Sequence, residues 1–100
     1  NKKLYLTPNL KIGDVARASG ICRTYISTYI NQVKGMSFSD YINSLRVEHV
    51  KTLLSSNNAN IKISTIATNS GFSSLQSFYR NFNKFTGMKP LEWVKEKQEE

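Results

Sequence analysis

The chain has few of the residues on which cross-links, metal sites and catalytic centres depend. Its 100 residues include one cysteine, Cys22, and one histidine, His49. A single cysteine excludes an internal disulfide, and no cluster of Cys and His has the spacing of metal ligands. The sequence also lacks a Ser-His-Asp set, a glycine-rich phosphate loop and a pair of carboxylates flanking a cleft. We therefore expect a protein that is not an enzyme, with no catalytic residue, no metal and no cofactor.

Long apolar segments are also missing. The sequence contains no run of about 18 apolar residues, the length needed to span a membrane. It also contains no basic segment followed by an apolar one, as a signal peptide would have. The unpaired Cys22 is typical of a reducing compartment, so we expect a cytoplasmic protein with no membrane partner for this segment. Because the sequence begins with Asn1 and not with Met, we also expect a C-terminal fragment of a longer protein.

Acidic residues are scarce outside the C-terminal end. Lys and Arg total 14 against 7 Asp and Glu, which gives a formal net charge of +7. Residues 1–91 contain 12 of the basic residues and only three acidic ones, a net charge of +9. Such an excess attracts polyanions, although solubility alone also explains it.

The chain contains the same pattern twice, once in each half. Each copy has a short amphipathic helix, a glycine turn, a second helix and a Gly-Met pair that ends it. Two tandem helix-turn-helix units on a basic chain indicate DNA binding. The recurring residues are Ile12, Ala16, Ser19 and Gly20, repeated as Ile63, Ala67, Ser70 and Gly71 at a shift of 51, and Asn31, Gly35 and Met36, repeated as Asn83, Gly87 and Met88 at a shift of 52.

The apolar residues have helical spacing throughout, and no segment alternates strongly enough to predict a strand. We expect an all-α, homeodomain-like fold of about seven helices, the first of them truncated within residues 1–10. In the helix over 23–34 we expect Ile26, Ile30 and Val33 to face inward. The other helices are predicted over 11–19, over roughly 18 residues after Gly35, over 62–70, over 74–86 and from Pro90 onward.

Helix caps and the aromatic residues complete the local predictions. Ser37 and Ser73 are predicted N-caps, Ser73 in a capping box with Gln76, whereas Cys22 is a poorer cap. Because Arg46 lies within an apolar stretch, we expect it to form structural hydrogen bonds and not to contact DNA. The aromatic residues have the helical spacing of a buried stripe and not of a base-stacking surface; they are Phe72, Phe78, Phe82, Phe85 and Trp93.

The predicted organisation is two helix-turn-helix subdomains, residues 1–36 and 56–100, joined by a linker helix over 37–55. A helix of 18 residues is about 27 Å long. Together with the width of the packed units, this length could place two recognition helices in successive major grooves, which recur about every 34 Å. The site on double-stranded DNA would then be asymmetric or a direct arrangement.

The chain resembles the DNA-binding domain of the AraC/XylS family of bacterial transcription regulators over roughly residues 10–94. This resemblance implies a seven-helix fold that binds promoter DNA and usually activates transcription by contacting RNA polymerase, in the bacterial cytoplasm at the nucleoid. It implies no small-molecule ligand in this domain. The residues that carry it include Asp14-Val15-Ala16, Gly35-Met36-Ser37-Phe38, Leu45-Arg46-Val47, Gly71-Phe72-Ser73-Ser74, Phe78-Tyr79-Arg80-Asn81-Phe82 and Thr86-Gly87-Met88-Lys89-Pro90.

The resemblance also implies which residues bind DNA. Arg80 could contact guanine and Gln76 adenine through bidentate hydrogen bonds, with phosphate contacts or plain solvation as the alternatives. Tyr79 could touch a thymine methyl group or a phosphate, or pack half-buried. Family members often have Arg at Thr28 and Lys at Asn31, so we expect weaker binding by the first unit. The candidates are Arg23, Thr24, Ser27, Thr28 and Asn31 in the first recognition helix, and Ser74, Leu75, Gln76, Tyr79, Arg80, Asn83 and Lys84 in the second.

One alternative function is a basic helical module that binds RNA or an acidic protein partner. Duplex binding would lose affinity steeply between about 50 and 200 mM salt and would keep its sequence preference.

Overall fold

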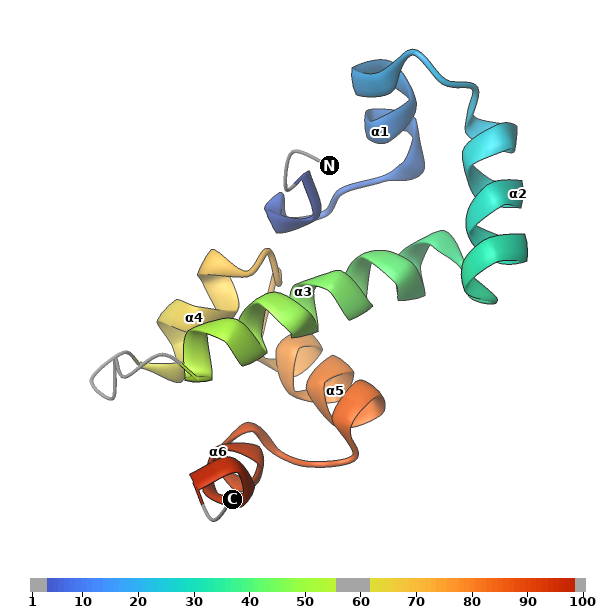
Figure 1. Ribbon diagram of the computed structural model, residues 1–100. Helices are drawn as coiled ribbons and strands as arrows, with labels where there is room; N and C mark the ends of the chain where they lie inside the picture. Colours follow the sequence, from blue (N-terminus) through green and yellow to red (C-terminus); the bar gives the residue numbers. More distant parts are fainter. Residues whose placement is uncertain (1–3, 56–61, 99–100) are drawn as a thin grey trace.

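The computed structural model describes residues 4–55 and 62–98, and every regular element in this part of the chain is helical. The all-α prediction is therefore confirmed. A 3₁₀ turn, η1, stands where the truncated first helix was expected. The elements are η1 (Leu4–Leu6), α1 (Ile12–Ser19), α2 (Arg23–Lys34), α3 (Phe38–Ser55), α4 (Ile63–Asn69), α5 (Leu75–Thr86) and α6 (Pro90–Gln98) (Figure 1).

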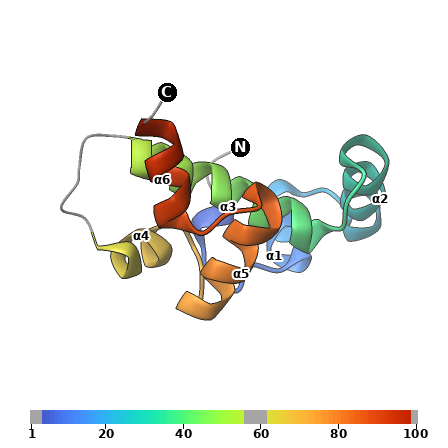
Figure 2. The same cartoon turned by 90° about the horizontal axis from the view of Figure 1, so that it is seen from below.

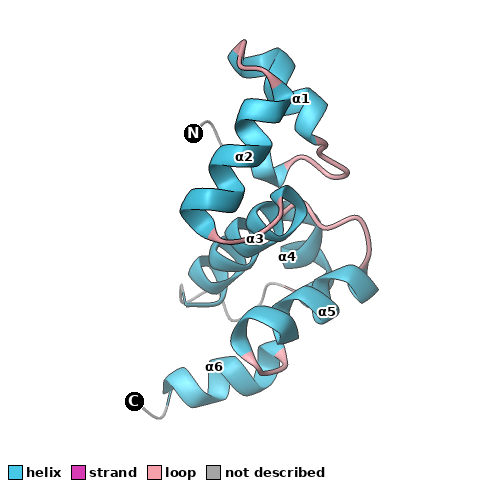
Figure 3. Cartoon of the chain, turned by 90° about the vertical axis from the view of Figure 1, so that its right-hand side faces the viewer, coloured by secondary structure: helices cyan, strands magenta, loops and turns pink. Residues whose placement is uncertain are grey.

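The long helix α3 is the axis of an elongated molecule that measures 44 × 23 × 22 Å. Helices α1 and α2 lie at the N-terminal end of α3, and α4, α5 and α6 pack around the rest of it (Figures 1 and 2). We call residues 4–35 the first unit and residues 62–98 the second unit. The side view places α2 and α5 on either side of α3 (Figure 3).

Two matching glycines end the helices α2 and α5. Gly35 and Gly87 have φ values of 67° and 75°, the left-handed conformation that glycine adopts without a steric penalty. Their amides donate to the carbonyls of Asn31 at 3.0 Å and Asn83 at 2.7 Å. The predicted C-terminal ends are therefore confirmed.

The predicted N-caps are partly right. Ser37 Oγ accepts a hydrogen bond from the Asp40 amide at 3.1 Å, as expected. At α5 the prediction is wrong by one residue, because Ser74 and not Ser73 is the N-cap and accepts from the Ser77 amide at 3.1 Å. The repeat shift grows from 51 to 52 across this turn, so the second unit has one more turn residue. Cys22 caps α2 without a side-chain hydrogen bond.

The main core lies where the second half of α3 meets the second unit. Phe78 and Phe82 of α5 are fully buried against Val47 and Val50 of α3. The ring of Trp93 meets Phe82 edge to face, with centroids 6.2 Å apart. Phe72 is buried in the same cluster, and Phe85 packs against it partly buried, so the predicted aromatic core is confirmed.

In the first unit the predicted inward face of α2 is partly wrong. Ile26 and Ile30 are buried, whereas Val33 is 56% exposed. The repeat equivalent of Val33 is Phe85, whose larger side chain reaches the core of the second unit. α2 meets only the N-terminal end of α3 (Figure 1).

Arg46 joins the N-terminal segment to α3. Its guanidinium is buried and donates to the carbonyls of Tyr5 at 2.6 Å and Thr7 at 2.9 Å, and to Asn43 Oδ1 at 3.0 Å. The predicted structural role of this arginine is confirmed.

Candidate nucleic-acid interface

The five candidate residues of the first unit all lie on α2, and all are exposed. Thr24, Thr28 and Asn31 are spaced by three or four residues, so they share one face of the helix. The buried Ile26 and Ile30 hold the opposite side of α2 against the protein. The structure therefore presents a polar surface of small hydrogen-bonding side chains, with Arg23 and Ser27 beside it.

The candidates of the second unit lie on α5 or at its N-cap, and all seven are exposed. Gln76, Arg80 and Asn83 form a polar row opposite the buried Phe78 and Phe82. No described residue forms a hydrogen bond or ion pair with the side chains of these three, which leaves them available to a ligand. The remaining candidates in this helix are Ser74, Leu75, Tyr79 and Lys84.

Tyr79 lies at the edge of the core and is partly exposed. Its side chain is 45% exposed, and its ring lies 5.2 Å from the ring of Phe78. Leu75, also 45% exposed, adds a second apolar contact surface in the first turn of α5. One edge of the polar row could therefore contact thymine methyl groups.

Two candidates already have partners within the protein. Ser74 Oγ is used as the cap of α5. Lys84 Nζ lies 2.8 Å from Asp40 Oδ1 in the first turn of α3, an ion pair between residues 44 positions apart. No sequence pattern indicated this pair. Lys84 thus ties the end of α5 to the start of α3.

The N-terminal ends of α2 and α5 suit an anionic partner. The first turns of α2, α5 and the short helix α4 contain no acidic residue, whereas those of α1, α3 and α6 contain Asp14, Asp40 and Glu92. Free backbone N–H groups at a helix start carry partial positive charge and attract phosphate. At Cys22, the N-cap of α2, the backbone N–H groups of Tyr25 and then Thr24 lower the pKa of the thiol.

Other kinds of site have little support in the described part of the chain. No group of three His, Cys, Asp or Glu side chains within residues 4–55 and 62–98 could hold a metal ion. None of the helices described is both long enough and apolar enough to cross a membrane.

The sequence is similar to those of known helix-turn-helix regulators. A family profile described as a helix-turn-helix domain matches residues 4–96. The melibiose operon regulatory protein of Escherichia coli K12 is 33% identical over 90 residues, which are 90% of this chain and 29% of that protein. An HTH-type transcriptional regulator of Staphylococcus aureus MSSA476 is 29% identical over 91 residues, 91% of this chain and 12% of that protein. The chain thus spans less than a third of these relatives.

Solved structures with the same fold are also similar in sequence. The C-terminal domain of AraT, a response regulator from Geobacillus stearothermophilus, superposes with a TM-score of 0.80 at 27% identity, covering 93% of this chain and 75% of that one. A probable AraC family transcriptional regulator from Rhodopseudomonas palustris CGA009 superposes with a TM-score of 0.74 at 25% identity, covering 93% of this chain and 85% of that one.

Proposed function

Since the chain belongs to the AraC family of helix-turn-helix transcription regulators, as a DNA-binding domain, we propose that it inserts α2 and α5 into successive major grooves of promoter DNA. The observation that carries this proposal is the exposure of all twelve candidate residues on two equivalent helices. Each helix is anchored by buried residues on its other side. α3, between them, is about 27 Å long, which with the width of the flanking helices approaches the groove repeat of about 34 Å.

The residues of α5 are the stronger candidates for base recognition. Arg80 matches the O6 and N7 acceptors of guanine, and Gln76 matches the N6 and N7 atoms of adenine. On α2, the short side chains of Thr24, Thr28 and Asn31 suit phosphate and water-mediated contacts. We therefore assign most base discrimination to the second unit and expect the first unit to contribute weaker contacts with a smaller sequence preference.

The wider role follows from family membership. We propose one DNA-binding domain made of residues 1–36, the linker 37–55 and residues 56–100, within a bacterial regulator that acts at the nucleoid. Activation through contact with RNA polymerase is the proposed mode of control. The melibiose relative is by name an operon regulator, which supports control of transcription.

Selection from a random duplex library tests DNA reading directly. We expect an asymmetric consensus with two preferred segments about one helical turn, or roughly 10 base pairs, apart. Affinity for the selected site should fall steeply between about 50 and 200 mM salt, while its preference over random duplex persists. Absence of any enriched sequence, together with equal or tighter binding to RNA or to an acidic protein, would refute the proposal.

Arg80→Ala and Arg80→Lys separate base recognition from charge. Loss of a bidentate guanine contact removes about 1 to 3 kcal/mol of discrimination, or roughly 5- to 150-fold. Because lysine keeps the charge but not the planar fork, Arg80→Lys should lose discrimination and retain non-specific affinity. Equal losses on selected and random duplexes in both variants would rule out this role for Arg80.

A further inference from the structure

The edge of α5 that lies beside its polar row is apolar. Leu75 and Tyr79 are four residues apart, so their side chains are neighbours on one side of the helix, and each is 45% exposed. At about 3.6 residues per turn, this side lies between the polar row of α5 and its two fully buried phenylalanines. A duplex that contacts the polar row therefore lies close to both side chains.

The first unit has no such apolar edge. At a shift of 52, Leu75 corresponds to Arg23 and Tyr79 to Ser27, and both counterparts are polar. All four residues are exposed. Because the repeat folds with polar residues at these positions in α2, packing does not require apolar ones in α5. The leucine and the tyrosine are therefore better explained by what α5 binds.

The apolar edge is held in place by contacts within the second unit. The ring of Tyr79 lies 5.2 Å from the ring of Phe78, which is fully buried. Leu75 follows directly after the N-cap Ser74, whose Oγ accepts a hydrogen bond from the Ser77 amide at 3.1 Å. Since this part of α5 is already ordered, binding through the edge costs less conformational entropy than binding through a loop.

The size and the charge of the surroundings indicate what the edge binds. Two side chains offer much less area than the roughly 800 Å² that each partner contributes to a standard protein interface. Within α5 the charged residues are Arg80 and Lys84, both basic, so the neighbouring surface attracts a polyanion. The apolar group that DNA presents in its major groove is the methyl group of thymine. A methyl group on a base therefore fits both the size of the edge and the charge around it.

We propose that Leu75 and Tyr79 bind the 5-methyl group of a pyrimidine, so that α5 recognises 5-methylcytosine as well as thymine. This inference rests on the proposed insertion of α5 into a major groove. It adds a sensitivity to chemical modification of DNA, because methylation of a cytosine at this position supplies the group that the apolar edge binds. Uracil and unmodified cytosine lack that group.

Uracil in place of thymine tests the methyl contact, because it removes this group and keeps the hydrogen-bonding groups of the base. Each thymine of a duplex selected from the random library is replaced in turn, and affinity is measured by fluorescence anisotropy. Burial of one methyl group changes affinity by roughly fourfold. We expect a loss of this size at one or two thymines, within the segment whose sequence preference Arg80→Ala removes.

5-Methylcytosine supplies the converse test. At the same positions a cytosine–guanine pair replaces the thymine–adenine pair, and the duplex is made with and without the 5-methyl group on cytosine. We expect the methylated duplex to bind roughly fourfold more tightly than the unmethylated one. Both should bind more weakly than the thymine duplex, because the hydrogen-bonding groups of the base pair have changed. Similar ratios in the two tests would identify the methyl group itself as the contact.

Leu75→Ala and Tyr79→Ser remove parts of the apolar edge. In each variant the affinity ratio of the thymine and uracil duplexes should fall from about four to below about two. Two variants are used because Tyr79 packs on Phe78 and its loss can destabilise the fold. Tyr79→Phe keeps the ring and should keep the ratio, which separates the ring from its hydroxyl group. Leu91→Ala, at a residue of α6 that is 73% exposed, is the matched control and should leave the ratio unchanged.

The methyl contact and the proposed DNA reading fail through different results. A library that yields no enriched sequence refutes the DNA reading, and the methyl contact with it. Three results overturn the methyl contact alone: an enriched sequence without thymine in the segment read by α5, thymines that all tolerate uracil, or a thymine-to-uracil ratio that is unchanged in both Leu75→Ala and Tyr79→Ser.

Discussion

Gly71→Ala should destabilise the fold far more than the same change at Gly20, its equivalent in the first unit. Gly71 has φ +92°, and a Cβ there would lie 2.7 Å from the Tyr5 carbonyl oxygen and 2.8 Å from the Leu6 carbonyl carbon. These are backbone atoms, and Arg46 holds this segment by donating to the carbonyls of Tyr5 and Thr7 at 2.6 and 2.9 Å. The segment therefore cannot move aside without breaking those bonds.

The expected cost has two parts. Alanine in the left-handed region costs about 1 to 2 kcal/mol, and overpacking against fixed atoms adds about 1 to 3 kcal/mol. Gly20 has φ +74° and no heavy atom within 4 Å of a built Cβ, so Gly20→Ala carries only the first part. We expect the free energy of unfolding to fall about 2 to 5 kcal/mol for Gly71→Ala, and the Tm to fall by more than about 10 °C.

Urea and thermal unfolding, followed by circular dichroism at 222 nm, measure both variants against the unmodified chain. A third variant, Gly71→Ala with Arg46→Met, releases the segment. It should lose less than the sum of the two single changes, because the clash and the clamp act on the same carbonyls. Equal losses for Gly71→Ala and Gly20→Ala would refute the close approach of η1 to the second unit.

Three further predictions concern polar groups. Arg46→Met should lower the free energy of unfolding by about 2 to 4 kcal/mol in urea titrations, because it leaves two part-buried carbonyls without donors. Asp40→Asn should cost under about 1 kcal/mol of stability yet raise non-specific DNA affinity at low salt, measured by fluorescence anisotropy, since it frees Lys84. Because the pKa of the Cys22 thiol is lowered in the folded state, ionisation of the thiol stabilises the fold. The unmodified chain should therefore become increasingly more stable than Cys22→Ser as pH rises towards 9.0, and the two should be equally stable at lower pH. A stability difference that does not change with pH would contradict this prediction.

The local sequence pattern was enough to predict the helices, but not all of their caps and packing contacts. The ends of α2 and α5 follow from Gly35 and Gly87, whose effect depends on backbone conformation alone. The cap of α5 was missed by one residue, although the change of repeat shift from 51 to 52 contained the signal. An inserted turn residue moves the cap, and the serine pair Ser73-Ser74 allowed either choice.

Features that depend on tertiary packing could not be predicted from the helical pattern. Val33 has the spacing of an inward residue, but whether anything covers that side of α2 depends on where α3 crosses it. The Lys84–Asp40 pair joins residues 44 positions apart, and nothing local to either residue indicates it. The exposure of Gln76, Arg80 and Asn83 was predictable, because the buried Phe78 and Phe82 define the opposite face of α5.

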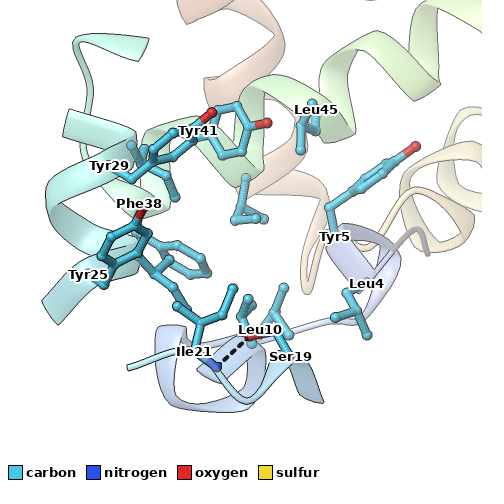
Figure 4. Close-up of a pocket in the computed structure, with 14 residues that line it drawn as sticks. Leu4, Tyr5, Leu10, Ser19, Ile21, Tyr25, Tyr29, Phe38, Tyr41 and Leu45 are labelled. Carbon is cyan, nitrogen blue, oxygen red and sulfur yellow. Dashed lines mark hydrogen bonds between the residues drawn. The ribbon is translucent and has the colours of Figure 1, made fainter. Parts of the chain in front are cut away.

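The unequal packing of the two units bears on how they would act together on DNA. α5 is fixed by fully buried rings and by the ion pair to α3, whereas α2 rests on two isoleucines beside a pocket that residues of η1, α1 and α3 also line (Figure 4). In the free chain, the backbone amides of α2 should therefore exchange with deuterium faster than those of α5. Binding of a duplex that contains both preferred segments should slow exchange in α2 more than in α5, because α2 has more motion to lose. Equal exchange rates for the two helices of the free chain would contradict this difference in anchoring.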